Sequence, residues 1–255
     1  MNRLLCMGVS ACVLLTAGAA TAQDDSTTFV FGEYYGCDQN REAFSDYLME
    51  HVFGPMYDER VESGDLSGWG WSSHNAGGSW RRVMFYAAND LNKLLETRDS
   101  LIEEWQAEHA DANREFTSIC PDHDDLIWQS VAGSSVAQTV GTRSAASYST
   151  YYVCDVTKQE RADEIVKELY APVIDALVEA GELDSWGWYA HVIGNQYRRM
   201  MTHRAGSHAA LVDAVRKYNA AADDKDAAMA TELNQICNSH VDYLWDVKLP
   251  KPAEE

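Results

Sequence analysis

The chain has 255 residues, and its 20 basic residues against 40 acidic ones give a formal net charge of −20 at pH 7. Such acidity argues against a protein that binds nucleic acid or anionic membrane surfaces, because both would repel it. We interpret it as a charged surface that keeps the protein in solution. Binding of a cationic ligand and a saline habitat are the alternatives.

The first 22 residues have the pattern of a secretory signal peptide. Arg3 gives a positive start, a mostly apolar run covers residues 4–15, and Ala20-Thr21-Ala22 matches a cleavage site. The apolar run is too short to cross a bilayer. We therefore expect a secreted or periplasmic protein that is cut before Gln23 and keeps no membrane segment.

The rest of the chain contains a duplication. A shift of 117 positions places Trp69-Gly70-Trp71 on Trp186-Gly187-Trp188, and many other residues match at the same shift. A period this long is a whole domain and not a solenoid unit. The sequence therefore predicts a first repeat at 29–131, a linker at 132–147, a second repeat at 148–247 and a polar tail at 248–255.

Each repeat begins with a predicted strand, at 29–37 and 148–156, that is rich in aromatic and β-branched residues. Apolar residues at helical spacing follow, and Thr157-Lys158-Gln159-Glu160 fits a capping box at the start of the second of these helices. Pro55 and Pro172 lie inside the helices and should kink or break them. Gly64 and Gly181 should end them with a left-handed residue.

A hairpin comes next in each repeat, with strands at 66–74 and 80–86, or at 183–193 and 197–203. Asp90 and Ser207 are expected N-caps of further helical segments. A last strand follows at 126–131 or 243–247. The order strand, helix, strand, strand, helix, strand is the βαββαβ pattern of ferredoxin-like domains, so the fold class is α+β with two tandem repeats.

Four cysteines remain after the signal peptide, two in each repeat. An even number in an exported protein favours disulfides. The duplication singles out Cys37 with Cys120 and Cys154 with Cys237, or the crossed arrangement between repeats. In this topology the end of the first strand lies near the start of the last strand, which favours pairing within each repeat. A zinc site would need reduced thiols, so we expect no metal.

The element order and the duplication resemble the dimeric α/β-barrel superfamily of ferredoxin-like domains, in which some chains carry both copies. The resemblance implies two sheets pressed face to face, as a pseudo-dimer within one chain, with a pocket between them. The superfamily includes small monooxygenases, haem-binding enzymes and proteins of no known activity, so the likeness names no ligand. It leaves the oligomeric state open.

Strand alternation selects candidate ligand-binding residues. We expect Trp69 and Trp71 to pack beneath the helices, so the opposite face of the hairpin would look toward the other repeat. One arginine of each neighbouring pair must enter a covered space, where it needs a carboxylate, carbonyl groups or an anionic ligand. The candidates are His74, His191, Arg81, Arg82, Arg198, Arg199, Tyr34, Tyr35, Tyr151 and Tyr152. Alternatively Asp38, Asp155 or another acid pairs with the arginine, and the histidines only complete hydrogen bonds.

The sequence thus predicts an exported, soluble protein that binds a small molecule in two related pockets between its sheets. One alternative is an enzyme of the same fold, either a cofactor-free monooxygenase-like enzyme or a haem-dependent one. Another is a structural or interaction domain. The residues show no evident cofactor motif, since a c-type haem attachment site, a phosphate-binding loop and a nucleophile elbow are all missing from the sequence.

Overall fold

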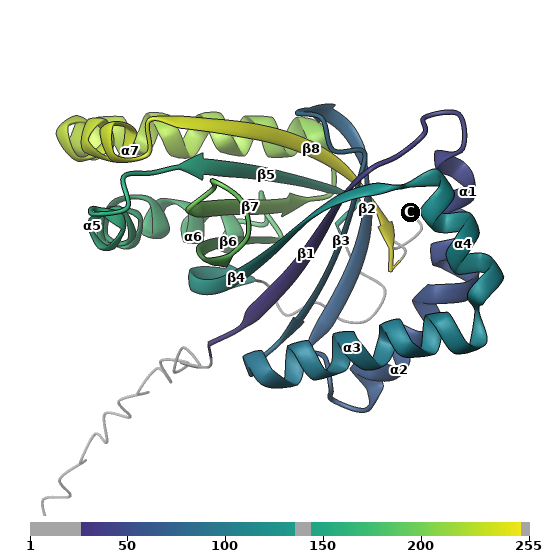
Figure 1. Ribbon diagram of the computed structural model, residues 1–255. Helices are drawn as coiled ribbons and strands as arrows, with labels where there is room; N and C mark the ends of the chain where they lie inside the picture. Colours follow the sequence, from purple (N-terminus) through teal and green to yellow (C-terminus); the bar gives the residue numbers. More distant parts are fainter. Residues whose placement is uncertain (1–26, 136–143, 251–255) are drawn as a thin grey trace, which may run out of the picture.

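The two repeats form one closed antiparallel barrel with helices on its outside (Figure 1). This computed structural model describes residues 27–135 and 144–250, so the predicted signal peptide lies outside the described residues. Within these ranges, none of the helices combines the length and the apolar character that a membrane span requires.

The predicted order of elements is confirmed in both repeats. The first repeat contains β1 (Phe29–Gly36), α1 (Glu42–Leu48), the π-helical turn η1 (Met49–Phe53), α2 (Gly54–Glu62), β2 (Gly68–Gly77), β3 (Arg82–Ala88), α3 (Leu91–Glu108), α4 (Ala110–Ile119) and β4 (Asp122–Ser135). The second contains β5 (Ala146–Val153), α5 (Gln159–Ile165), the π-helical turn η2 (Val166–Tyr170), α6 (Ala171–Glu179), β6 (Ser185–Ile193), β7 (Arg199–Ala205), α7 (His208–Ile236) and β8 (Ser239–Leu249).

The two sheets join at both of their edges. Around the barrel the strand order is β1-β3-β2-β8-β5-β7-β6-β4, so β2 pairs with β8 and β4 pairs with β6. The sheets that the resemblance placed face to face are therefore opposite walls of one barrel, and the helices of the two repeats lie on opposite sides of it (Figure 1). Closure leaves no sheet edge unpaired along these seams.

Alternation along the strands separates an outer face, covered by helices, from the barrel interior. Trp69 and Trp71 are buried on the outer face, as predicted. The indole of Trp71 donates to Asp46 at 2.7 Å, and the guanidinium of Arg82 binds the same carboxylate at 2.7 and 2.9 Å. The second repeat reproduces this arrangement with Trp188, Asp163 and Arg199.

The first helix of each repeat contains a π turn directly before its proline. The amide of Gly54, ahead of Pro55, bonds the carbonyl of Met49 in η1, and the same bond joins Ala171 to Val166 in η2. A proline has no amide hydrogen to donate, and the wider turn accommodates it. The predicted kink or break is therefore a π turn within a helix that continues.

Helix ends follow the predicted signals with one exception. Gly64 and Gly181 have φ of 78° and 72°, and the side chains of Asp90 and Ser207 cap the next helices. The capping box at Thr157 is wrong, because α5 begins at Gln159 without a side-chain cap. The Thr157 hydroxyl instead donates to Asp155, whose carboxylate also accepts the backbone amide of Thr157 and forms a local turn.

Two disulfides close the repeats individually. Cys37 bonds Cys120 and Cys154 bonds Cys237, with Cα atoms 4.0 and 3.9 Å apart, so the predicted pairing within each repeat is confirmed. Each bond ties the end of the first strand to the residue that leads into the last strand. The two disulfides suggest an oxidising, extracytoplasmic environment.

Candidate functional site

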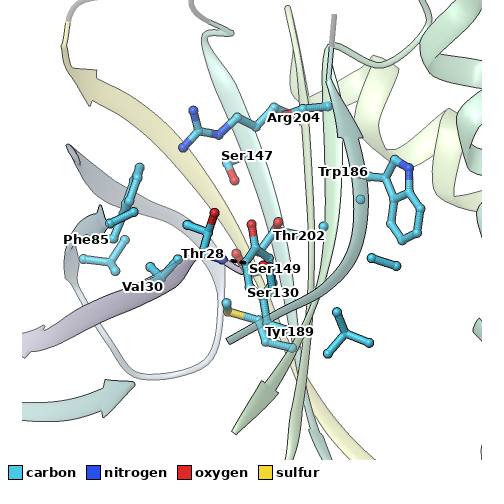
Figure 2. Close-up of a pocket in the computed structure, with 18 of the residues that line it drawn as sticks. Thr28, Val30, Phe85, Ser130, Ser147, Ser149, Trp186, Tyr189, Thr202 and Arg204 are labelled. Carbon is cyan, nitrogen blue, oxygen red and sulfur yellow. Dashed lines mark hydrogen bonds between the residues drawn. The ribbon is translucent and has the colours of Figure 1, made fainter. Parts of the chain in front are cut away.

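A cavity of about 720 Å³ occupies part of the barrel interior and is bordered by strands of both repeats (Figure 2). It lies toward the end of the barrel where β1, β5 and β6 begin and β3, β4 and β7 end. Lining residues near that end, such as Thr28, Phe85 and Arg204, are half-buried, whereas Ser72 and Ser149 are buried. The gradient in burial indicates that the cavity opens at this end.

Aromatic side chains close the other end of the barrel. Tyr34 and Tyr151 meet edge to face at 5.5 Å at the base of the cavity, and Trp80 lies against both. The indole of Trp128 donates to the Tyr34 hydroxyl at 3.3 Å. Its counterpart Trp245 lines the cavity, and its buried indole nitrogen has no hydrogen-bond partner among the described residues.

The glycines of the two Trp-Gly-Trp motifs make room for aromatic side chains inside the barrel. A Cβ at Gly70 would collide with the ring of Phe85, and a Cβ at Gly187 would collide with the ring of Tyr189. Both rings therefore lie against a glycine and border the cavity. This close approach explains why glycine alternates with tryptophan at both places.

Arg204 is the one charged side chain among the described residues that line the cavity. Its guanidinium carbon lies 5.2 Å from the centre of the Phe85 ring, a cation–π contact across the interior (Figure 2). Burial raises the pKa of Tyr189, while the positive charge of Arg204 acts in the opposite direction. Burial also raises the pKa of Tyr34 to about 12, so the base of the cavity offers a neutral phenol.

The cavity combines apolar walls with many hydroxyl groups. Described lining residues with hydroxyls come from both repeats, and the amide of Thr28 donates to the hydroxyl of Ser130 at 2.9 Å (Figure 2). Neither carboxylates nor imidazoles occur among the described lining residues. The arrangement can accept a small molecule through apolar contact, hydroxyl hydrogen bonds and one cationic group.

The fold of the chain resembles that of several solved structures. No family model matches the chain, and no curated protein matches its sequence. A candidate monooxygenase from Fusobacterium nucleatum superimposes with a TM-score of 0.61 at 8% identity, covering 87% of this chain and 92% of that one. An anthrone oxidase-like protein superimposes with a TM-score of 0.55 at 12% identity, covering 91% and 98%.

A chlorite dismutase variant from Candidatus Nitrospira defluvii also superimposes, with a TM-score of 0.52 at 8% identity, covering 87% of this chain and 92% of that one. The protein has the fold of the dimeric α/β barrels. At these identities the similarity establishes the ferredoxin-like, dimeric α/β-barrel architecture and leaves the chemistry to the site itself.

Both predicted tyrosine pairs separate across the wall of the barrel. Tyr34 and Tyr151 point inward and line the cavity. Tyr35 and Tyr152 point outward, where their rings lie 5.8 and 5.5 Å from those of Trp71 and Trp188 beneath the helices. The separation follows from alternation, because neighbouring residues of a strand face opposite sides.

The predicted histidines lie at the opposite end of the barrel from the cavity opening. His74 Nδ1 is 2.9 Å from a guanidinium nitrogen of Arg81, and His191 Nδ1 is 3.0 Å from one of Arg198. Burial and the charge of Arg198 lower the pKa of His191. None of these four residues borders the cavity, so their role in ligand binding stays a prediction.

Arg82 and Arg199 are the buried members of the arginine pairs, and they point outward under α1 and α5. Their carboxylate partners are Asp46 and Asp163. The partner of each buried arginine was expected to be either a bound ligand or an acidic residue. The structure shows an acidic residue, although it is neither Asp38 nor Asp155.

The cavity residues that sequence reasoning did not select come mainly from positions where the repeats differ. Arg204 follows Met200 and Thr202 at strand spacing, but the predicted strand 197–203 ended one residue before it. Its counterpart in the first repeat is Ala87, which also lines the cavity. A comparison of the repeats restricted to inward positions would have exposed this difference.

Proposed function

We propose that the protein is an exported binding protein that holds a small molecule inside its barrel. The cavity carries this proposal, because about 720 Å³ lies within the range of roughly 300–1,000 Å³ that ligand sites occupy. Its opening and its buried base suit a ligand that enters from one end. The two disulfides support the exported location.

Filling the cavity tests this function directly. A thermal-shift screen of small molecules with the wild type should yield binders, and Ala87→Phe and Ser149→Phe should abolish their stabilising effect by occupying the space. Ala220→Phe, on the exposed face of α7, is the matched control and should bind as the wild type does. A screen in which every binder also stabilises both filled variants would refute the site.

Export is tested separately. Expression of the whole chain in a bacterial host, followed by fractionation and intact mass measurement, should give an envelope or medium form that begins at Gln23. A chain that stays in the cytoplasm at full mass would contradict the localisation while leaving the cavity proposal intact.

An enzyme of the same fold is the second candidate, favoured by neighbours described as monooxygenases and chlorite dismutase. The described lining residues do not suit haem held by histidine or cysteine, because they include neither, and the Met200 sulfur already accepts the Tyr34 hydroxyl at 3.9 Å. A cofactor-free oxidation remains testable by oxygen uptake with the ligands found in the screen. Uptake that disappears in Ser149→Phe would establish it.

A further inference from the structure

The duplication allows the two walls of the cavity to be compared position by position. β1 and β3 form one wall, and their counterparts β5 and β7 form the wall opposite, four strands away around the barrel. At the base the walls agree, because Tyr34 on β1 matches Tyr151 on β5. Any difference nearer the opening therefore stands out against a shared framework.

Near the opening the two walls differ in polarity. The inward residues of the first repeat that line the cavity are apolar, and their counterparts at the 117-residue shift are larger or polar: Val30 matches Ser147, Val83 matches Met200, Phe85 matches Thr202 and Ala87 matches Arg204. One wall thus presents hydrocarbon and an aromatic ring, and the other presents hydroxyls, a guanidinium and the thioether of Met200. Figure 2 shows Val30 and Phe85 together on one side of the pocket.

We propose that the ligand is a flat anion with an aromatic body and one carboxylate-type group. This deepens the proposed function and rests on it. The aromatic body would lie against Val30, Val83 and Phe85, where burial of apolar surface is favourable. The anionic group would meet Arg204, whose planar guanidinium matches the two oxygens of a carboxylate.

The geometry also limits how far apart the two parts of the ligand are. Because the Arg204 guanidinium lies 5.2 Å from the Phe85 ring, an anion that reaches it stays next to an aromatic body on that ring. A carboxylate attached directly to a ring system satisfies this spacing.

Pairs of probes with the same shape and different charge test the inference. Benzoate, 2-naphthoate and anthracene-2-carboxylate, each with its primary amide, would be titrated into the whole mature protein by calorimetry. We expect at least one acid to bind about tenfold or more tightly than its amide, as a hydrogen-bonded charge pair would give.

The variant Arg204→Met keeps an apolar stem over Phe85 and removes the charge. It should bind acid and amide with similar affinity, close to that of the amide in the wild type. Arg204→Lys should retain part of the preference for the acid. Arg216→Met, at an exposed arginine of α7, should leave the preference unchanged. Phe85→Thr, which copies the residue of the opposite wall, should weaken acid and amide by the same factor.

The outcomes separate this inference from the proposed function. Equal binding of acid and amide by the wild type, or a preference for the acid that survives in Arg204→Met, would overturn the proposal of an anionic ligand. A molecule that binds the wild type and fails to bind Ser149→Phe would still support the cavity as the binding site. If neutral molecules from the screen bind and all three acids fail, the inference is likewise overturned. If no molecule of any charge binds the wild type, the proposed function itself fails.

Discussion

Asp163 binds Arg199 through both carboxylate oxygens, at 2.6 and 2.7 Å, beneath helix α5. The same carboxylate accepts the indole of Trp188 at 2.7 Å, so one acid joins the helix to two neighbouring strands. Asp46 does the same in the first repeat, but there Arg82 has a second acid, Glu42, at 3.1 Å. The position equivalent to Glu42 is Gln159, which is uncharged.

We therefore expect Asp163→Ala to destabilise the protein by about 3 kcal/mol or more, because it leaves the buried guanidinium of Arg199 without a counter-charge. Asp46→Ala should cost less, since Glu42 still balances Arg82. The free energies of unfolding from urea titrations give the comparison. Equal losses in the two variants would show that the second acid contributes nothing.

His203 makes stability sensitive to acid. It is fully buried, and burial lowers its pKa to about 3, whereas an unfolded histidine titrates near pH 6.5. Its contribution to stability is therefore present above pH 6.5 and is lost as the pH falls toward 3, by roughly 2 kcal/mol between pH 6.5 and pH 5. Urea titrations at the two pH values should show that His203→Phe removes this loss. His51→Phe, at an exposed histidine, should retain it.

Glu33 should make the protein less stable as the pH rises, which is the opposite of the effect of His203. Burial raises the pKa of Glu33, against the opposing effect of hydrogen bonds from the hydroxyls of Tyr35 and Tyr86. Stability is then greatest below the pKa of an unfolded glutamate and falls as the pH rises. The wild type should lose stability relative to Glu33→Gln between pH 4.5 and pH 8. A constant difference over that range would contradict the prediction, and the exposed Glu62→Gln provides the baseline.

Each disulfide should stabilise its own repeat. Cys154 and Cys237 are 83 positions apart, and a loop of that length corresponds to about 4.5 kcal/mol of stabilisation in the chain-entropy description. The double change Cys154→Ser/Cys237→Ser should cost that amount in urea unfolding, and Cys37→Ser/Cys120→Ser, with the same spacing, should cost a similar amount. Peptide mapping without reductant that linked Cys37 to Cys154 would contradict the pairing.

Much of the fold could be predicted because each element is indicated by two similar stretches of sequence, one in each repeat. The length of β4 could not, since the small residues near Gly133 have low strand propensity and resemble a linker. Their size has a structural reason. A Cβ at Gly133 would come within 2.7 Å of the Trp186 carbonyl oxygen, where β4 runs close to β6.

The site was harder to predict for a related reason. Residues that recur in both repeats, such as Arg82 and Arg199, were natural candidates, and the structure gives them carboxylate partners in the scaffold. The cavity depends on residues that do not recur, such as Phe85 and Arg204. Residues that match between the repeats mostly stabilise the fold of each half, and residues that differ line the cavity.

The seams between β2 and β8 and between β4 and β6 join halves that belong to one chain. A barrel assembled from two separate chains comes apart on dilution, because association depends on concentration. Here the partner of each half is always supplied by the same molecule. The interior therefore stays closed however dilute the protein becomes, and its unfolding should be a unimolecular event with a midpoint independent of protein concentration.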